Sequence, residues 1–221
     1  SEAGNGLRNE PYTIAMGLVG GDVDSAQSQF YINVGTNDYL DDDYTVFGSV
    51  IAGQSTVQRI SQLRTIGEDV PLEVPRIRRA VQTAGYPLMP LHTGSWFNAD
   101  TSGTGFNIEI TNDASTESGP LAIVYWYDFS EGQPIWLTGV GSFEWGDHTI
   151  TLDLLYTPSP VADADFRTPP AREAFESWGT LTIEFSSCAS GAVSYDSPSA
   201  GTATVDVTRL SLPFGESCES L

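Results

Sequence analysis

The second half of the chain alternates between strand-like runs and short turns, a pattern that restricts it to an antiparallel β fold. The run "PLAIVYWYDF" is followed by the turn "SEGQ" and then by "PIWLTGVGSFEW", which is a strong hairpin signal. A second hairpin is predicted where "WGTLTIEFSSC" is followed by "ASG" and "AVSYD". About seven or eight strands in up-and-down order, with no convincing helix, predict a meander barrel or sandwich. A polar, Pro-rich stretch, residues 158–173, is expected to form a long loop.

The first part of the chain contains both strand and helix signals. Three strands are expected, at residues 12–19, 28–35 and 44–53. Within "SQFYIN", alternation predicts Phe30 and Ile32 in the core and Gln29 and Tyr31 on the opposite face. A helix is predicted over 54–63, with Ser55 as its N-cap, and a closing strand over 75–83.

Composition changes near residue 85, which suggests two domains. The first part carries a net charge of −5 and the remainder a net charge of −15. The junction is rich in Gly and Pro, as linkers are. We therefore expect a first domain at residues 1–85, a linker at 86–94 and an all-β domain at 95–221.

The charge of the chain is strongly acidic, with 29 acidic residues against 9 basic ones, all of them Arg. A net charge of −20 repels nucleic acid and anionic membranes, so neither is expected as a partner. The acidity favours solubility in a salty or extracellular setting, and binding of cations or basic partners is the alternative. No apolar run is long enough to span a membrane.

Cys188 and Cys218 are the two cysteines of the chain, and we expect them to form one disulfide that fastens the C-terminal tail. A disulfide implies an oxidising compartment, so we expect a periplasmic, cell-surface or extracellular protein. The chain begins without Met or a signal peptide, and we interpret it as a processed or truncated product.

Metal and cofactor sites are not expected. The cluster Asp41–Asp43 lacks the spacing of a calcium loop and is interpreted as a solvated turn. His92 and His148 have no Cys or carboxylate at metal-ligand spacing. An aromatic platform for sugars or peptides is one interpretation, and core or cross-strand packing the other, for a set of five rings: Trp96, Trp126, Tyr127, Trp136 and Trp145.

One stretch of the first part resembles a known family: "NGLRNEPYTIAMG…DSAQSQFYINVGTNDYLDDDYTVFGSVIAGQSTVQRI" is similar to the C-terminal half of a cyclophilin-type peptidyl-prolyl cis-trans isomerase. The match covers about residues 3–83, with its elements in the family's order. Cyclophilins are closed eight-stranded β-barrels. The resemblance therefore implies a partial cyclophilin-like β-barrel with one helix, followed by the second β domain.

The resemblance also implies a proline-binding groove, which in this sequence would include Met16, Gly17, Leu18, Gln29, Tyr31, Tyr39, Leu40 and Tyr44. Leu18 departs from the family, which commonly has Asn there, and Tyr39 stands where many members have Trp or Phe. Proline-containing peptides or proteins are the implied ligands.

The family's catalytic Arg lies in an F-H-R-type segment, which does not occur in these 221 residues. Arg8, in the loop before the first matched strand, is a poor substitute. No catalytic residue is therefore assigned, and we expect little or no turnover from this chain alone. The amide bond that such an enzyme rotates has a barrier of ~18–20 kcal/mol.

Half of a barrel exposes strand edges and an apolar interior. Three explanations stay open: a separate nicked N-terminal half-chain, a fragment, or a neighbouring subunit that completes the barrel. The first functional hypothesis is an exported cyclophilin-type isomerase, seen without its N-terminal half, with an accessory β domain. The alternative is a non-catalytic extracellular binding or assembly protein, such as a surface or filament component, that reuses the scaffold.

The second part resembles an unnamed β-repeat domain of secreted bacterial proteins. The resemblance rests on "GSWFNADTSGTGFNIEI", on the "VYWYDFSEGQPIWL" hairpin and on the Cys-bearing "LTIEFSSCASGAVSY". No established activity comes with this resemblance, so it implies export and leaves the role of the domain open.

Overall fold

The structure is a computed structural model that describes residues 4–67, 69–101, 103–112, 119–157, 175–212 and Cys218. It is mainly β, with one α-helix. The chain divides into two compact units, Ser1–Arg78 with Gly215–Leu221, and Arg79–Phe214. Each unit is described separately below.

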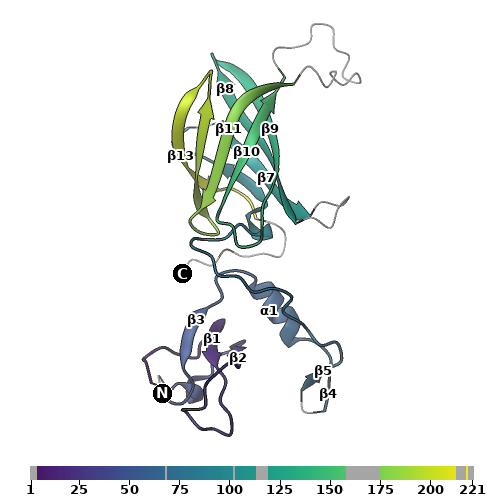
Figure 1. Cartoon of the computed structure of the whole chain (residues 1–221). Coiled ribbons are helices and arrows are strands. Elements are labelled where there is room, and N and C mark those ends of the chain that lie inside the picture. Colours follow the sequence, from purple (N-terminus) through teal and green to yellow (C-terminus); the bar gives the residue numbers. More distant parts are fainter. Residues whose placement is uncertain are drawn as a thin grey trace. The chain divides into compact units, whose positions relative to one another are not determined.

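The first unit contains a small antiparallel sheet with the strand order β2-β1-β3 (Figure 1). Its strands are β1 (Thr13–Met16), β2 (Phe30–Ile32) and β3 (Val46–Ser49), shorter than the runs expected from the sequence. A 3-10 turn, η1 (Asp38–Leu40), lies between β2 and β3. Ala15 of β1 is paired with Tyr31 on one side and with Val46 on the other.

The expected helix is present as α1 (Gln54–Ser61), but the expected N-cap is wrong. The N-cap is Gly53, whose φ of 84° lies in the left-handed region that glycine enters without a Cβ clash. A two-stranded hairpin follows, β4 (Thr65–Ile66) and β5 (Val70–Pro71). The closing strand expected over 75–83 is not formed, and Ile77 and Val81 are exposed there without a strand partner among the described residues.

The interior of the first unit is small and largely polar. Phe30 is 48% exposed, so its expected place in a core is wrong, and Ile32 is half-buried. The physical reason is that β2 lies at the edge of a three-stranded sheet with no second apolar layer among the described residues. The buried side chains of this unit are Asn9, Ala15, Asn33, Thr45 and Val46.

The second unit is a closed barrel of eight antiparallel strands in up-and-down order (Figure 1), which confirms the expected meander barrel. The strands are β6 (Gly94–Phe97), β7 (Gly105–Asn112), β8 (Pro120–Ser130), β9 (Gln133–Ser142), β10 (Thr149–Tyr156), β11 (Glu176–Phe185), β12 (Ser190–Ser197) and β13 (Gly201–Arg209). Pairing of β13 with β6 closes it. Both expected hairpins are formed, β8–β9 and β11–β12.

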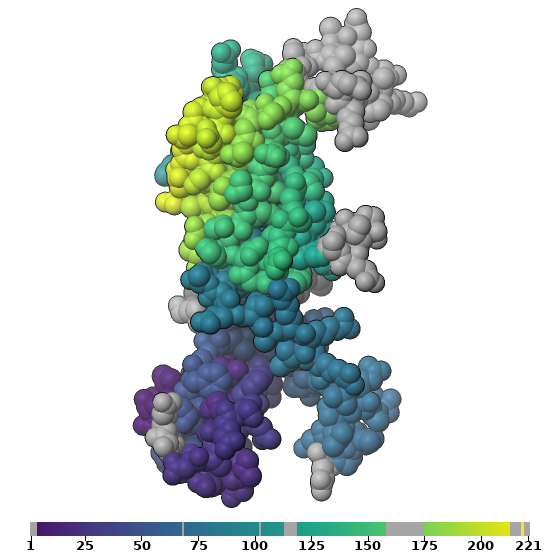
Figure 2. Space-filling view, in the orientation of Figure 1, coloured from purple at the N-terminus to yellow at the C-terminus, as the bar shows by residue number. Residues whose placement is uncertain are grey.

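Alternation along the strands explains the barrel interior. In β10, Ile150, Leu152 and Leu154 are buried, and the residues between them are not. The β8–β9 turn has positive φ at both Glu131 and Gly132, as a two-residue hairpin turn requires. On the face shown in Figure 2, side chains cover the barrel strands as a continuous surface.

Residues 86–94, expected to be a linker, contribute to the barrel. Leu88 is part of its hydrophobic core, and Tyr86 packs against that core. A 3-10 turn, η2 (Pro90–His92), brings Leu91 and His92 to buried positions. The segment is rich in Gly and Pro, but its apolar side chains still find a place inside the barrel.

Cys188 and Cys218 are both disulfide-bonded, which confirms the expected bridge because the chain has two cysteines. The long loop expected over 158–173 lies entirely outside the described residues. Among the helices that the structure describes, none has the length and apolar character needed to cross a bilayer.

Candidate functional site

The β1–β2 pair brings Met16, Gly17 and Gln29 together. Met16 is paired with Phe30, and the next amide, of Gly17, donates a hydrogen bond to the Gln29 carbonyl at 2.7 Å. A Cβ built on Gly17 would lie 3.1 Å from the Gln29 Cβ, so the missing side chain permits this approach. Leu18 follows directly and is half-buried. The backbones of Gly17 and Gln29, two residues of the expected groove, therefore lie side by side.

Two tyrosines form the aromatic part of the candidate site. The rings of Tyr31 and Tyr44 meet edge to face, with centroids 5.9 Å apart and planes at 76°. The Tyr44 amide donates to the Leu40 carbonyl at 2.9 Å, which ties the turn after η1 to this pair. Tyr39 is 76% exposed and projects into solvent. The structure thus brings Tyr31, Tyr44 and the Leu40 backbone together and leaves Tyr39 outside.

The buried side chain of Asn9 supports the aromatic pair from behind. Its Oδ1 accepts hydrogen bonds from the Tyr31 hydroxyl at 2.8 Å and from the Asn33 amide at 3.1 Å. Its backbone amide and its Nδ2 both donate to Asp41 Oδ1, at 2.7 and 3.1 Å. The hydrogen bond from the Asn9 amide lowers the pKa of Asp41 below its usual value. These bonds join segments about 20 to 30 residues apart and fix the Tyr31 ring.

The environment of Tyr31 decides what its phenol can do. Burial, with smaller contributions from Tyr44, Tyr39 and Asp41, raises the pKa of Tyr31 to about 12. The hydroxyl therefore stays protonated near neutral pH and donates its hydrogen bond to Asn9. This part of the site offers an apolar ring edge and neutral hydrogen-bonding groups, which suits binding of an uncharged ring better than proton transfer.

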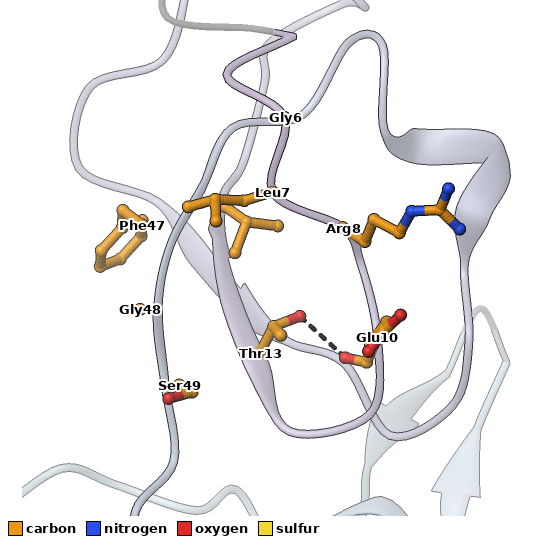
Figure 3. Close-up of a pocket in the computed structure, with 9 residues that line it drawn as sticks. Gly6, Leu7, Arg8, Glu10, Thr13, Phe47, Gly48 and Ser49 are labelled. Carbon is orange, nitrogen blue, oxygen red and sulfur yellow. Dashed lines mark hydrogen bonds between the residues drawn. The ribbon is translucent and has the colours of Figure 1, made fainter. Parts of the chain in front are cut away.

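A separate hollow of about 450 Å³ lies along β3 and the segment before β1. Leu7, Thr13 and Phe47 are among the residues that line it, and none of the eight expected groove residues does. Arg8 also borders the hollow, but Figure 3 shows its guanidinium extending away from Leu7 and Phe47. The charge of Arg8 makes a smaller contribution to the lowered pKa of Asp41, which accepts the hydrogen bonds of Asn9.

The acidic cluster contributes a structural group. Asp41 accepts hydrogen bonds from Asn9, whereas Asp42 and Asp43 are exposed. Within the part of the chain that the structure describes, no group of three His, Cys, Asp or Glu side chains is arranged to hold a metal ion. Sequence reasoning missed Asn9 and Asn33, since their partners lie far away along the chain and no local pattern marks them.

Comparison with known proteins supports the resemblance over the first unit. Residues 1–82 match the family model described as "Cyclophilin type peptidyl-prolyl cis-trans isomerase/CLD". A peptidyl-prolyl cis-trans isomerase A of Dickeya dadantii is 40% identical over 89 residues, covering 38% of this chain and 46% of the relative. A peptidyl-prolyl cis-trans isomerase of Acinetobacter baylyi is 41% identical over 81 residues, covering 34% and 43%.

A third relative, peptidyl-prolyl cis-trans isomerase cyp18 of Streptomyces antibioticus, is 40% identical over 85 residues, covering 33% of this chain and 51% of the relative. The chain spans about half the length of these curated relatives. No solved structure matches the chain significantly. Residues 1–82 are therefore similar in sequence to part of the cyclophilin-type peptidyl-prolyl cis-trans isomerase family.

Proposed function

We propose that the first unit forms one wall of the proline-binding groove of an exported cyclophilin-type isomerase, with the barrel as an accessory domain. The observation that carries this proposal is the edge-to-face pair of Tyr31 and Tyr44, held in place by the buried Asn9. A proline ring is apolar and compact, so it packs against an aromatic side chain. Gln29 and the Gly17 backbone, which are hydrogen-bonded to each other, would extend this wall.

The chemistry requires no nucleophile and no proton acceptor. Rotation about the X-Pro bond is opposed by the partial double-bond character of the amide, and a hydrogen-bond donor near the proline nitrogen weakens that character. The neutral wall binds the proline, and a guanidinium supplied by an F-H-R-type segment would act on the amide. We propose that a separate N-terminal half-chain or a neighbouring subunit contributes that segment.

The sheet offers a route for such a partner. Strand order β2-β1-β3 leaves β2 and β3 each paired with one strand among the described residues. An unpaired strand edge favours addition of a further strand from another segment. Phe30 and Phe47, both about half exposed, lie on these edge strands and would be covered by an added layer.

The test is isomerisation of a proline tetrapeptide by this chain, alone and mixed with an N-terminal cyclophilin half that contains the F-H-R segment. We expect little turnover alone and clear turnover from the mixture. In the mixture, Tyr44→Ala should remove turnover, whereas Ile66→Ala, at an exposed position of β4 outside the three-stranded sheet, should retain most of it. No turnover from a mixture shown to associate would contradict the proposal.

A non-catalytic binding or assembly role is the second candidate. It is favoured by the sequence, since no F-H-R-type segment occurs in these 221 residues. Under this alternative, proline peptides would perturb the amide signals of Gly17 and Gln29 in nuclear magnetic resonance spectra. No mixture would then accelerate isomerisation.

A further inference from the structure

The outer surface of the barrel is not uniform. On β12 and β13 the outward side chains are small and polar, as in the Ala192–Asp206, Ser194–Thr204 and Asp196–Thr202 pairs. Most outward side chains of β8 and β9 are large and apolar instead, with Thr138 and Ser142 of β9 as polar exceptions. We call these seven residues the aromatic strip: Ile123, Tyr125, Tyr127, Phe129, Pro134, Trp136 and Val140.

The centre of the aromatic strip is the cross-strand pair of Tyr127 and Trp136. Their ring centroids are 5.9 Å apart and their planes are tilted by 48°, so the two rings form an open V. Trp136 is 67% exposed. The Tyr127 ring packs over Gly105 of β7. A Cβ added at Gly105 would lie 2.9 Å from the Tyr127 hydroxyl oxygen, so the glycine permits this close contact. A rigid pair of exposed rings costs little conformational entropy on binding.

The strip extends well beyond this pair. From Ile123 to Phe129 it runs for about 20 Å along β8. Beyond the seven residues, Leu155 of β10, which is 40% exposed and lies opposite Thr138 of β9, continues the apolar surface on one side. Contiguous exposed apolar surface of this kind marks interaction sites in soluble proteins.

The backbone of β8 cannot recruit an added strand. β8 is paired along its length with β7 on one side and β9 on the other, and β9 pairs with β10 at Leu137–Gly139. A ligand on this face must therefore be held by its side chains and leave its own backbone solvated. A polyproline II segment meets that condition, because it has no internal hydrogen bonds and presents proline rings to aromatic side chains. A length of about six or seven residues matches the strip.

Charge selects the remaining side chains of the ligand. Residues 105–156, which include β7 to β10, contain eight acidic residues and no Lys or Arg. Glu109 of β7, paired with Ile123, and Asp153 of β10 are both exposed on the outer face, one on each side of the strip. An acidic border of this kind attracts cationic ligands and repels anionic ones.

We propose that the aromatic strip is a docking site for an extended, basic, proline-rich peptide segment. Proline rings pack against the solvent-facing surfaces of Tyr127 and Trp136, and Arg or Lys side chains reach the carboxylates that border the strip. The site is separate from the candidate groove on the first unit, and it does not depend on isomerase activity.

The test uses the full chain and a fluorescent peptide of about 12 residues with a repeating Pro-Pro-Arg sequence. Fluorescence anisotropy should show saturable binding that weakens as salt increases. Trp136→Ala should weaken the affinity by at least about 10-fold, because exposed Trp anchors dominate such interfaces. Thr204→Ala on the polar outer face of β13 is the matched control and should leave the affinity unchanged.

Comparison peptides test the chemistry of the ligand. Replacing Arg with Glu should abolish binding, and replacing Pro with Ala should weaken it. Equal binding by the Trp136→Ala variant, or equal binding of the Glu peptide, would overturn the proposal. Displacement of the peptide by a neutral oligosaccharide would reassign the strip to sugars. Self-association that Trp136→Ala removes, with no peptide binding, would reassign it to a second copy of this chain.

Discussion

Replacing His92 with phenylalanine should remove much of the acid sensitivity of the barrel. The His92 side chain is 0% exposed and stacks on Phe185, with ring centroids 3.9 Å apart. Its Nδ1 accepts a hydrogen bond from the Met89 amide at 3.1 Å. Nε2 faces the Ser187 backbone without a hydrogen bond of good geometry among the described residues. Arg209 is the cation that faces this ring, and no carboxylate is among the groups that perturb it.

The direction of the effect follows from this environment. Burial first, and the charge of Arg209 second, lower the pKa of His92 from 6.5 to about 3. The unfolded chain binds a proton below about pH 6.5, whereas the folded barrel keeps His92 neutral. The stabilisation is therefore fully present above pH 6.5 and is lost as the pH falls towards 3.

The magnitude follows from the size of the shift. A pKa unit corresponds to about 1.4 kcal/mol, so the whole window contributes on the order of 4–5 kcal/mol. Between pH 7.5 and pH 4, His92 alone should lower the free energy of unfolding by about 3 kcal/mol. Carboxylates also titrate over this range, and the comparison between variants separates the two contributions.

Urea unfolding of the barrel, followed by tryptophan fluorescence at pH 7.5, 5.5 and 4, provides the measurement. The His92→Phe variant keeps the ring stack on Phe185 but loses the acceptor for the Met89 amide, so we expect lower stability at pH 7.5. It should then lose about 3 kcal/mol less than the wild type down to pH 4. His148→Gln, at the second histidine, is the control and should behave as the wild type. Parallel pH profiles for wild type and His92→Phe would refute the reasoning.

Three further changes test other parts of the structure. Asn9→Ala leaves the hydroxyl of Tyr31 without its acceptor and should destabilise the first unit by about 2–3 kcal/mol, measured by hydrogen exchange. Mass spectrometry of unreduced peptides should link Cys188 to Cys218, and two free thiols would contradict the bridge. Because the bridge closes a loop of about 30 residues, its reduction should lower the free energy of unfolding by about 3–4 kcal/mol, measured by thermal unfolding. Gly105→Val would bring a Cβ against the Trp96 carbonyl oxygen and should lower the thermal midpoint of the barrel, whereas Thr202→Val on the exposed outer face of β13 should leave the midpoint unchanged.

The barrel could be predicted from the sequence because its information is local. Alternating apolar residues and compact turns specify each hairpin, and consecutive hairpins leave few ways to arrange the strands. The segment before the barrel could not be assigned in the same way. Leu88 and His92 lie in a Gly- and Pro-rich stretch with no periodicity, and their burial depends on space left inside the barrel.

The first unit shows where a local pattern misleads. "SQFYIN" alternates as a strand with an apolar face, and the strand is formed, yet Phe30 is half exposed because burial needs a second layer that alternation cannot supply. Similarly, Ser55 is a residue type that often caps helices, but Gly53 is the N-cap here and the helix begins at Gln54. Backbone conformation outweighed side-chain preference at that position.

Polar contacts explain why the candidate site could be located but not built from the sequence. The resemblance pointed to Tyr31 and Tyr44, and the structure places them in contact. What orients Tyr31 is Asn9, which is joined to Asp41 across 32 residues of sequence. A hydrogen bond between distant residues leaves no periodicity, so a buried Asn is read as a loop residue. In this unit, with few buried apolar side chains, we infer that such bonds contribute more to the position of the aromatic pair than hydrophobic packing does.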